Sequence, residues 1–318
     1  MAERPQEHHQ YFSPALTSTS KGSRLATPGA APRELLGWVP EGALSVQVSA
    51  LDLQAWWRYL GALVADLSEL GVPDLDRTVG DLLGVDVARD LVGGTAPGLI
   101  VVQTGLGETA ALGAPANDLL GETVFGLPTT DDAAAEAGLR RLLEELAQLV
   151  ALFADPFAEP GANAVVVVRE VTLAGVGARA YDVLPGLTLI TAVADGMAWI
   201  ATHEEGLERV LLAGRGGAPL PAPLADLADL VPAGATAFGL ADDRASLAAT
   251  GAALEQQVQL LAGFASGGID FDAVERATDA LEAYLEAIAP RFGGTASWSS
   301  HGGAGQLGGD ERAFIDLR

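Results

Sequence analysis

The sequence predicts an α+β protein in which a strand-helix-helix-strand unit occurs twice and the sheet is largely antiparallel. Val39-Pro40-Glu41-Gly42-Ala43 opens the first unit, and Val231-Pro232-Ala233-Gly234-Ala235 opens the second. Gly93-Gly94-Thr95-Ala96 stands near the end of the first unit, and Gly293-Gly294-Thr295-Ala296 near the end of the second. Two amphipathic helical patterns separate the phrases each time. Together these observations indicate one supersecondary unit used twice, with the second copy truncated.

The composition is that of a folded, strongly acidic protein. The chain has 318 residues, of which 49% are hydrophobic, which is enough to build a large core. Its formal net charge is −24, and Lys21 is its single lysine. Such a surface repels phosphate groups, so we expect no nucleic-acid partner. Cysteine is absent, which excludes disulfides, a thiolate nucleophile and a zinc site built on sulfur.

Residues 1–33 are rich in Ser, Thr, Pro and Ala, and we expect a disordered leader there. The segment lacks the apolar centre of a secretory signal, and no run in the chain reaches the roughly 18 apolar residues of a membrane span. We therefore expect no transmembrane segment. His8 and His9 lie in this leader, and we interpret them as an incidental pair rather than a metal site.

The first unit is expected to cover residues 34–214, and its opening half supplies two strands and two helices. Apolar and polar residues alternate over 43–49, which predicts a strand with one buried face. Asp52 then caps a helix whose apolar stripe contains Trp56 and Trp57, and we interpret both rings as core residues rather than ligand-stacking ones. A short helix follows Asp74-Leu75-Asp76, and 99–102 is a buried strand.

The closing half of the first unit predicts a long helix over a set of antiparallel strands. Thr123-Val124-Phe125 suggests one strand, and hydroxyls and carboxylates over 129–132 cap the long helix. Asp195-Gly196 indicates a tight hairpin, because its two positions tolerate positive φ. A further helix ends near Ala213. The later strands are predicted at 164–173, 178–184, 187–194 and 197–201.

The second unit is expected to cover residues 222–318, after a linker rich in Gly and Pro at 213–223. It predicts a strand at 236–240, helices that begin at Asp242-Asp243 and at Asp270-Phe271-Asp272, and strands at 293–298 and 314–317. It lacks the long helix and the four strands that follow in the first unit. Its exposed sheet edge therefore needs cover from the first unit or from another chain.

His203 is the most conspicuous candidate for chemistry. Glu204 and Glu205 follow it, and His301 is the other histidine of the expected folded part. A metal-assisted hydrolase using His203 with nearby carboxylates is one alternative function. We favour a structural interpretation, in which Thr202-x-x-Glu205 forms a capping box at the start of a helix.

Two other patterns are interpreted as structural. The pairs Asp74/Asp76 and Asp270/Asp272 stand at equivalent helix starts, where capping is expected, and neither continues into a calcium loop. Gly303-x-Gly305-x-x-Gly308 matches the dinucleotide fingerprint, but too few residues follow it to form the helix that holds a pyrophosphate. We assign no catalytic, cofactor-binding or metal-binding residue, and we expect no cofactor.

The proline-led units resemble an uncharacterised bacterial family. The matching phrases are the two Val-Pro units, Leu83-Gly84-Val85-Asp86-Val87 with Asp90-Leu91, and the hairpin and helix that begin at Leu189. The family is a domain-of-unknown-function group of exported or membrane-tethered proteins with repeated Val/Leu-Pro-x-Gly/Asp-Ala strand units. The resemblance covers roughly 35–298 and implies a cell-envelope location. It supplies no catalytic residues.

These observations favour a non-catalytic binding or structural protein with an unknown ligand. A protein partner, an apolar ligand and self-association stay open as its partners. The alternatives are the metal-assisted hydrolase and a self-associating scaffold built through the incomplete second unit.

Overall fold

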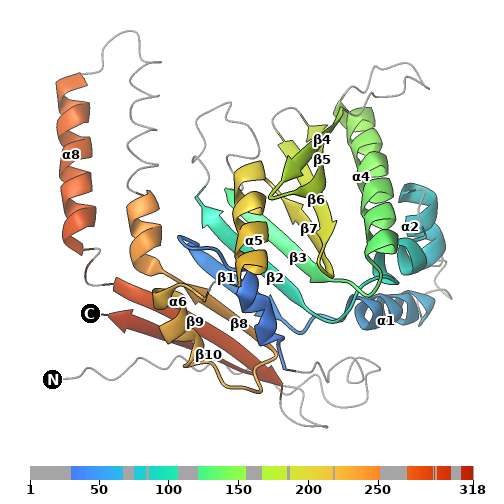
Figure 1. Cartoon of the computed structure of the whole chain (residues 1–318), viewed down its shortest axis with the longest axis horizontal. Coiled ribbons are helices and arrows are strands. Elements are labelled where there is room, and N and C mark those ends of the chain that lie inside the picture. Colours follow the sequence, from blue (N-terminus) through green and yellow to red (C-terminus); the bar gives the residue numbers. More distant parts are fainter. Residues whose placement is uncertain are drawn as a thin grey trace.

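The computed structural model describes residues 30–66, 75–83, 86–106, 121–154, 167–184, 187–217, 219–250, 271–288, 290, 292–301 and 309–317. Within them, ten strands form one sheet in which every neighbouring pair is antiparallel (Figure 1). In sheet order the strands are β10 (Gly309–Leu317), β9 (Phe292–His301), β8 (Ala237–Ala241), β1 (Ser45–Ser49), β2 (Leu99–Gly105), β3 (Glu122–Pro128), β7 (Met197–Ala201), β6 (Leu187–Ala194), β5 (Val176–Leu184) and β4 (Val168–Leu173). The predicted α+β class and antiparallel sheet are confirmed.

The helices stand on both faces of this sheet. They are η2 (Arg33–Trp38), α1 (Leu53–Asp66), α2 (Leu75–Leu83), the π-helical turn η4 (Val87–Val92), α4 (Asp132–Ala154), α5 (Glu204–Gly216), α6 (Ala222–Ala228) and α8 (Phe271–Ile288), with residues 243–250 also helical. Figure 1 shows α5 and α6 in front of the sheet, α4 beside β5 and β6, and α8 standing away from the strands. None of the described helices is both long enough and apolar enough to cross a membrane.

The two predicted units meet where β8 pairs with β1, the third and fourth strands in sheet order. Val48 pairs with Phe238 and Val46 with Leu240, so Gln47 and Gly239 form the central pair of the two antiparallel strands. One edge of β8 is thus covered by the first unit. The sequence predicts cover either from the first unit or from another chain.

The repeated Gly-Gly-Thr-Ala phrases do not occupy equivalent places. Ser49 pairs with Leu99, and the corresponding residue of β8, Ala241, pairs with Thr295. Leu99 is therefore the counterpart of Thr295, whereas the sequence match aligns Thr95 with it. That alignment is wrong by four residues, because the first phrase precedes β2 and the second lies inside β9. The strand-helix-helix-strand order is present in both units, and duplication from one ancestor stays a prediction.

The core lies on the face of the sheet that α5, α6 and η2 cover. A single cross-strand row of eight apolar side chains, each no more than 2% exposed, crosses from β5 to β9. The row is Ala180, Ile190, Ala201, Val124, Val102, Val46, Leu240 and Ala296. Because side chains alternate between the faces of a strand, this register places one buried layer under the helices.

Several local predictions are confirmed by the backbone and its caps. Asp52 accepts the amide hydrogen of Ala55 at 2.9 Å, and Asp131 accepts that of Ala134 at 3.0 Å. Asp242 accepts that of Ala245 at 2.9 Å. At the hairpin between β6 and β7, Asp195 has φ 55° and Gly196 has φ 75°, as a tight turn of this type requires.

Three predictions are wrong in detail. The predicted linker at 213–223 is partly helical, because α5 continues to Gly216 and α6 begins at Ala222. Trp57 packs on Val87 and Val92 as expected, but Trp56 is 47% exposed. The apolar stripe of α1 is wider than the surface that the short elements α2 and η4 cover, so one ring is left at the surface. The capping box at Thr202 is also absent, because His203 is the N-cap residue of α5.

Candidate functional site

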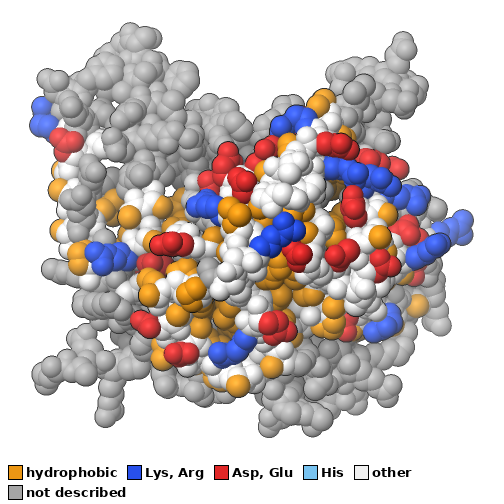
Figure 2. All heavy atoms as spheres, in the orientation of Figure 1, with side chains coloured by type: hydrophobic (Ala, Val, Ile, Leu, Met, Phe, Trp, Pro, Cys, Tyr) orange, Lys and Arg blue, Asp and Glu red, His pale blue; other side chains and the backbone are white. Residues whose placement is uncertain are grey.

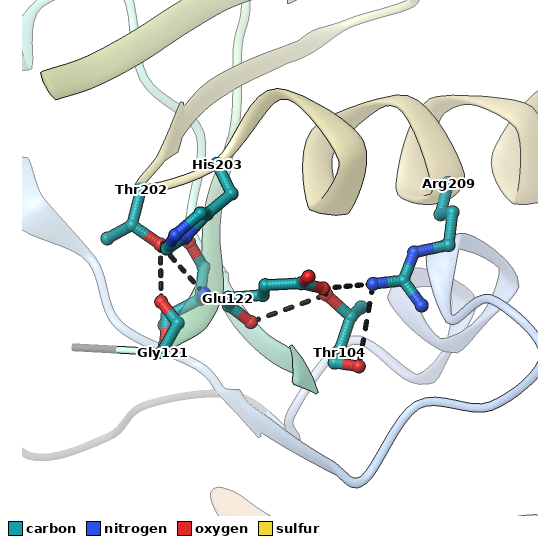
Figure 3. Close-up of polar contacts among 7 residues, drawn as sticks. Thr104, Gly121, Glu122, Thr202, His203 and Arg209 are labelled. Carbon is teal, nitrogen blue, oxygen red and sulfur yellow. Dashed lines mark hydrogen bonds and ion pairs between the residues drawn. The ribbon is translucent and has the colours of Figure 1, made fainter. Parts of the chain in front are cut away.

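His203 lies at the start of α5, and Thr202 connects it to strand β3 (Figure 3). His203 is the N-cap residue, and its side chain makes no capping hydrogen bond. The Thr202 hydroxyl donates to the carbonyl of Gly121 at 2.6 Å and accepts from the amide of Thr123 at 3.0 Å. It also lies 3.0 Å from Nδ1 of His203. The predicted capping box is therefore wrong, because Thr202 is buried and directed to β3.

A second polar group joins α5 to strands β2 and β3. Glu122 forms an ion pair with Arg209 and accepts a hydrogen bond from the Thr104 hydroxyl at 3.0 Å. Arg209 Nη2 also lies 3.5 Å from the carbonyl of Thr104 (Figure 3). Gly206 permits this close approach, since a Cβ there would lie 3.0 Å from Thr104 Oγ1. Glu122, Arg209 and Thr104 therefore satisfy one another's polar groups, and their contacts hold α5 on the sheet.

The carboxylates that follow His203 do not gather around it. Glu204 pairs with Arg169 at 3.2 Å, and Glu205 is exposed. No group of three or more His, Cys, Asp or Glu side chains suited to a metal occurs among the residues that the structure describes. The side chain of His301, like His8 and His9, lies outside the described residues.

The remaining candidates from the sequence stay apart or fall outside the described part. Asp76 accepts a hydrogen bond from Trp57 Nε1 at 2.6 Å, which fixes α2 against α1. Asp74 and Asp270 lie outside the described residues, as does the side chain of Asp272. The glycine phrase 303–308 lies outside them too, between β9 and β10.

A hollow lies between α4 and the strands β4, β5 and β6. It has a volume of about 420 Å³. Its α4 wall carries Glu136, Leu139 and Arg140, which occupy one helix face because they are spaced i, i+3 and i+4. The lining residues contributed by the strands are Glu170, Val171, Thr172, Gly177, Ala178, Arg179, Tyr181, Thr191, Ala192 and Val193. Acidic and basic side chains mix along α4 in Figure 2. We call this hollow the α4 cleft.

Arg179 is the central charged group of the α4 cleft. It stands directly opposite Glu170 on β4 and Thr191 on β6, so three side chains form one row across the cleft floor. Its Nη1 donates to Glu136 at 3.2 Å, and its Nε lies 4.0 Å from Glu170. The guanidinium is thus held between a carboxylate of the helix and a carboxylate of the sheet edge.

Tyr181 also lines the cleft, two residues after Arg179 on the same face of β5. Its ring packs with Leu143 and Val183, and its residue is fully buried. Its hydroxyl makes no hydrogen bond of good geometry among the described residues, although the side chains of Arg179 and Thr191 lie near it. Burial raises the pKa of this hydroxyl above its ordinary value of 10.0, while the charge of nearby Arg179 acts in the opposite direction. A buried hydroxyl without a good hydrogen bond is costly in a folded protein.

A second hollow, of about 260 Å³, lies on the face of the sheet that also carries the α4 cleft, over β2, β1, β8 and β9. Gly239 lies at its centre and is flanked by Gln47 and Ser297, its direct partners on β1 and β9. Its polar groups are a glutamine and several serine hydroxyls. It presents no charged side chain among the residues that line it.

The sequence did not identify the α4 cleft. Its lining residues come from four separate elements, and charged residues on a helix are ordinarily solvated. The sequence contained one indication: Arg179 lies in a predicted strand between Ala178 and Ala180, and both alanines are buried on the other face of that strand. That alternation places a cation on the face that α4 covers.

In comparisons with known proteins, no family model, no curated protein and no solved structure matches the chain. The resemblance to an uncharacterised bacterial envelope family stays a prediction.

Proposed function

We propose that this protein is a non-catalytic binding protein whose ligand occupies the α4 cleft. The observation that carries the proposal is the row of Glu170, Arg179 and Thr191 on the floor of a 420 Å³ hollow, with Glu136 and Arg140 above it. Concave sites of a few hundred Å³ with a few convergent polar groups are the usual places for small ligands in proteins.

The chemistry of the cleft suits binding better than reaction. None of its described lining residues is histidine, serine or cysteine, so it offers no nucleophile paired with an imidazole base. Its charged groups are two arginines and two glutamates, which orient ligands through charge-assisted hydrogen bonds. His203, the residue on which the hydrolase alternative rests, lies outside the cleft at the start of α5, where its Nδ1 contacts the Thr202 hydroxyl.

The experiment is a thermal-shift screen of the whole chain against amino acids, dicarboxylates, sugars, nucleotides and fatty acids. A ligand that binds the native state raises the melting temperature by mass action. We expect at least one compound class to raise it. Thr172→Trp, at an exposed position that lines the cleft, should remove that shift by filling the hollow.

Val168→Trp is the matched control, because Val168 is exposed on the same face of β4 and does not line the cleft. It should retain the shift. The proposal fails if no compound raises the melting temperature, or if the two tryptophan variants respond alike.

A further inference from the structure

The charged side chains that line the α4 cleft are equal in number, and both the helix wall and the floor carry one of each sign. Arg140 and Arg179 contribute two positive charges, and Glu136 and Glu170 contribute two negative ones. The surrounding chain is strongly acidic, with a net charge of −24. A ligand that carried one charge would therefore find its counterion and also a like charge in the same small hollow, and the like charge would oppose binding.

We propose that the α4 cleft binds a free amino acid with an aliphatic side chain, a proposal that rests on the binding function above. A zwitterion satisfies both signs at once. Its carboxylate meets the guanidinium groups of Arg179 and Arg140, and its ammonium group meets Glu136 or Glu170. Arginine suits the first role because its guanidinium offers five N–H donors in a fork that matches a carboxylate.

The ion pair already present in the cleft is loose enough to open for such a ligand. Side-chain exposure is 26% for Arg179, 58% for Glu136 and 83% for Glu170. Ion pairs with this much solvent around them contribute little net stability, so exchanging one for two ligand contacts costs the protein little. The Thr191 hydroxyl, in the next strand, offers one more hydrogen bond at the floor.

The uncharged part of the lining sets the side-chain preference. Leu139 on α4 and Val193 on β6 are half-buried and contribute an apolar wall. An aliphatic side chain gains about 25 cal/mol for each Å² of apolar surface that it removes from water against such a wall. A charged or strongly polar side chain would gain nothing there.

The test is isothermal titration calorimetry with three related probes: L-leucine, N-acetyl-L-leucine and L-leucinamide. The second probe lacks the ammonium charge, and the third lacks the carboxylate. We expect L-leucine to bind at least tenfold more tightly than either derivative, because each loses one set of charge-assisted hydrogen bonds. Tighter binding of the acetylated probe would identify an anion site, tighter binding of the amide a cation site, and either result overturns the inference.

Variants assign the contacts. Arg140→Gln and Arg179→Met should each weaken L-leucine binding about tenfold, and Glu136→Gln should weaken it as well. Arg89→Gln is the control: it removes the same charge as Arg140→Gln from a residue whose side chain is 85% exposed and which does not line the cleft. An equal loss in the control would show only a long-range charge effect and would contradict the inference.

Failure of this inference is distinguishable from failure of the binding function. If none of the three probes binds while the screen yields a ligand whose shift depends on Thr172, the cleft binds another class and only the amino-acid inference fails. If the screen yields no such ligand either, both proposals fail.

Discussion

Gln47 lies directly opposite Gly239 in the pairing of β1 with β8, and each is the eighth residue after the valine of its own Val-Pro turn. The two predicted units therefore meet about a local twofold axis at this pair. The consequence is one continuous sheet whose covered face is fully packed from β5 to β9. Gly239 leaves space on the opposite face, where a Cβ would lie 3.1 Å from Ser297 Oγ.

The two faces of β2 should respond differently to the same truncation. Val102→Ala removes two methyl groups from a fully buried position and should lower the free energy of unfolding by about 2 kcal/mol. Val101→Ala, at the half-exposed neighbouring residue, should cost well under half as much. Urea denaturation of the two variants measures this. Equal losses would mean that the register of β2 is wrong by one residue.

Gly126 should not tolerate a side chain. A Cβ at this position would lie 2.2 Å from Cζ3 of Trp199 and 2.8 Å from Cγ2 of Ile100, both of which belong to the core. Gly126→Ala should therefore lower the free energy of unfolding by about 1–3 kcal/mol. Gly37→Ala, where no atom lies within 4 Å, is the control and should be close to neutral in the same chemical denaturation experiment. A harmless Gly126→Ala would show that Trp199 does not lie over this glycine.

Thr202 and Glu205 should differ sharply, although a capping box would couple them. Thr202→Val leaves the carbonyl of Gly121 without its hydrogen bond in a buried place and should cost about 1–3 kcal/mol. Glu205→Ala removes an exposed carboxylate from the first turn of α5 and should change stability by less than about 1 kcal/mol. Thermal unfolding of both variants distinguishes the two arrangements. A large loss at Glu205 together with a small one at Thr202 would restore the capping box.

Tyr181 should make the protein sensitive to high pH. Burial raises the pKa of this hydroxyl in the folded state above 10.0, so the unfolded chain ionises first as the pH rises. The stability that the protonated form provides is fully present below pH 10 and is lost above it, by up to about 1.4 kcal/mol per pH unit. Tyr181→Phe should show a shallower loss in unfolding experiments between pH 9 and 11. Parallel curves for the two proteins would contradict this assignment.

The same substitution has an expected effect at neutral pH. Phenylalanine keeps the contacts of the ring with Leu143 and Val183 and removes a buried hydroxyl that makes no hydrogen bond of good geometry among the described residues, although Arg179 and Thr191 lie near it. Tyr181→Phe should therefore be at least as stable as the natural protein at pH 7, because the cost of burying an unpaired polar group disappears. A clear destabilisation at pH 7 would indicate that the hydroxyl is hydrogen-bonded in solution.

Local patterns predicted the elements of this fold well, because period and capping act within a few residues. The alternation over 43–49 gave the strand β1, and the carboxylates of Asp131 and Asp242 start their helices as expected. The hairpin at Asp195 and Gly196 follows from the backbone geometry that those residues permit.

Relationships between distant segments were harder to predict. Short glycine phrases align by composition, whereas strand equivalence depends on pairing, and so Thr95 and Thr295 matched in sequence without matching in structure. Thr202 was assigned to a cap because its partners, Gly121 and Thr123, lie about eighty residues away and leave no trace in local spacing. The α4 cleft was missed for the same reason, since Glu136, Glu170, Arg179 and Thr191 meet only through strand register and helix packing.

Hydrogen exchange of the whole chain with and without saturating L-leucine tests whether the α4 cleft is the binding site. Added protection should appear in peptides covering 136–140 and 170–193, which contain the floor and the helix wall of the cleft. Peptides covering 45–49 and 237–241, under the hollow at Gly239, and those covering 202–206, at His203, should be unchanged. Protection confined to either of those places, with none at β5 and β6, would show that the α4 cleft is not the binding site.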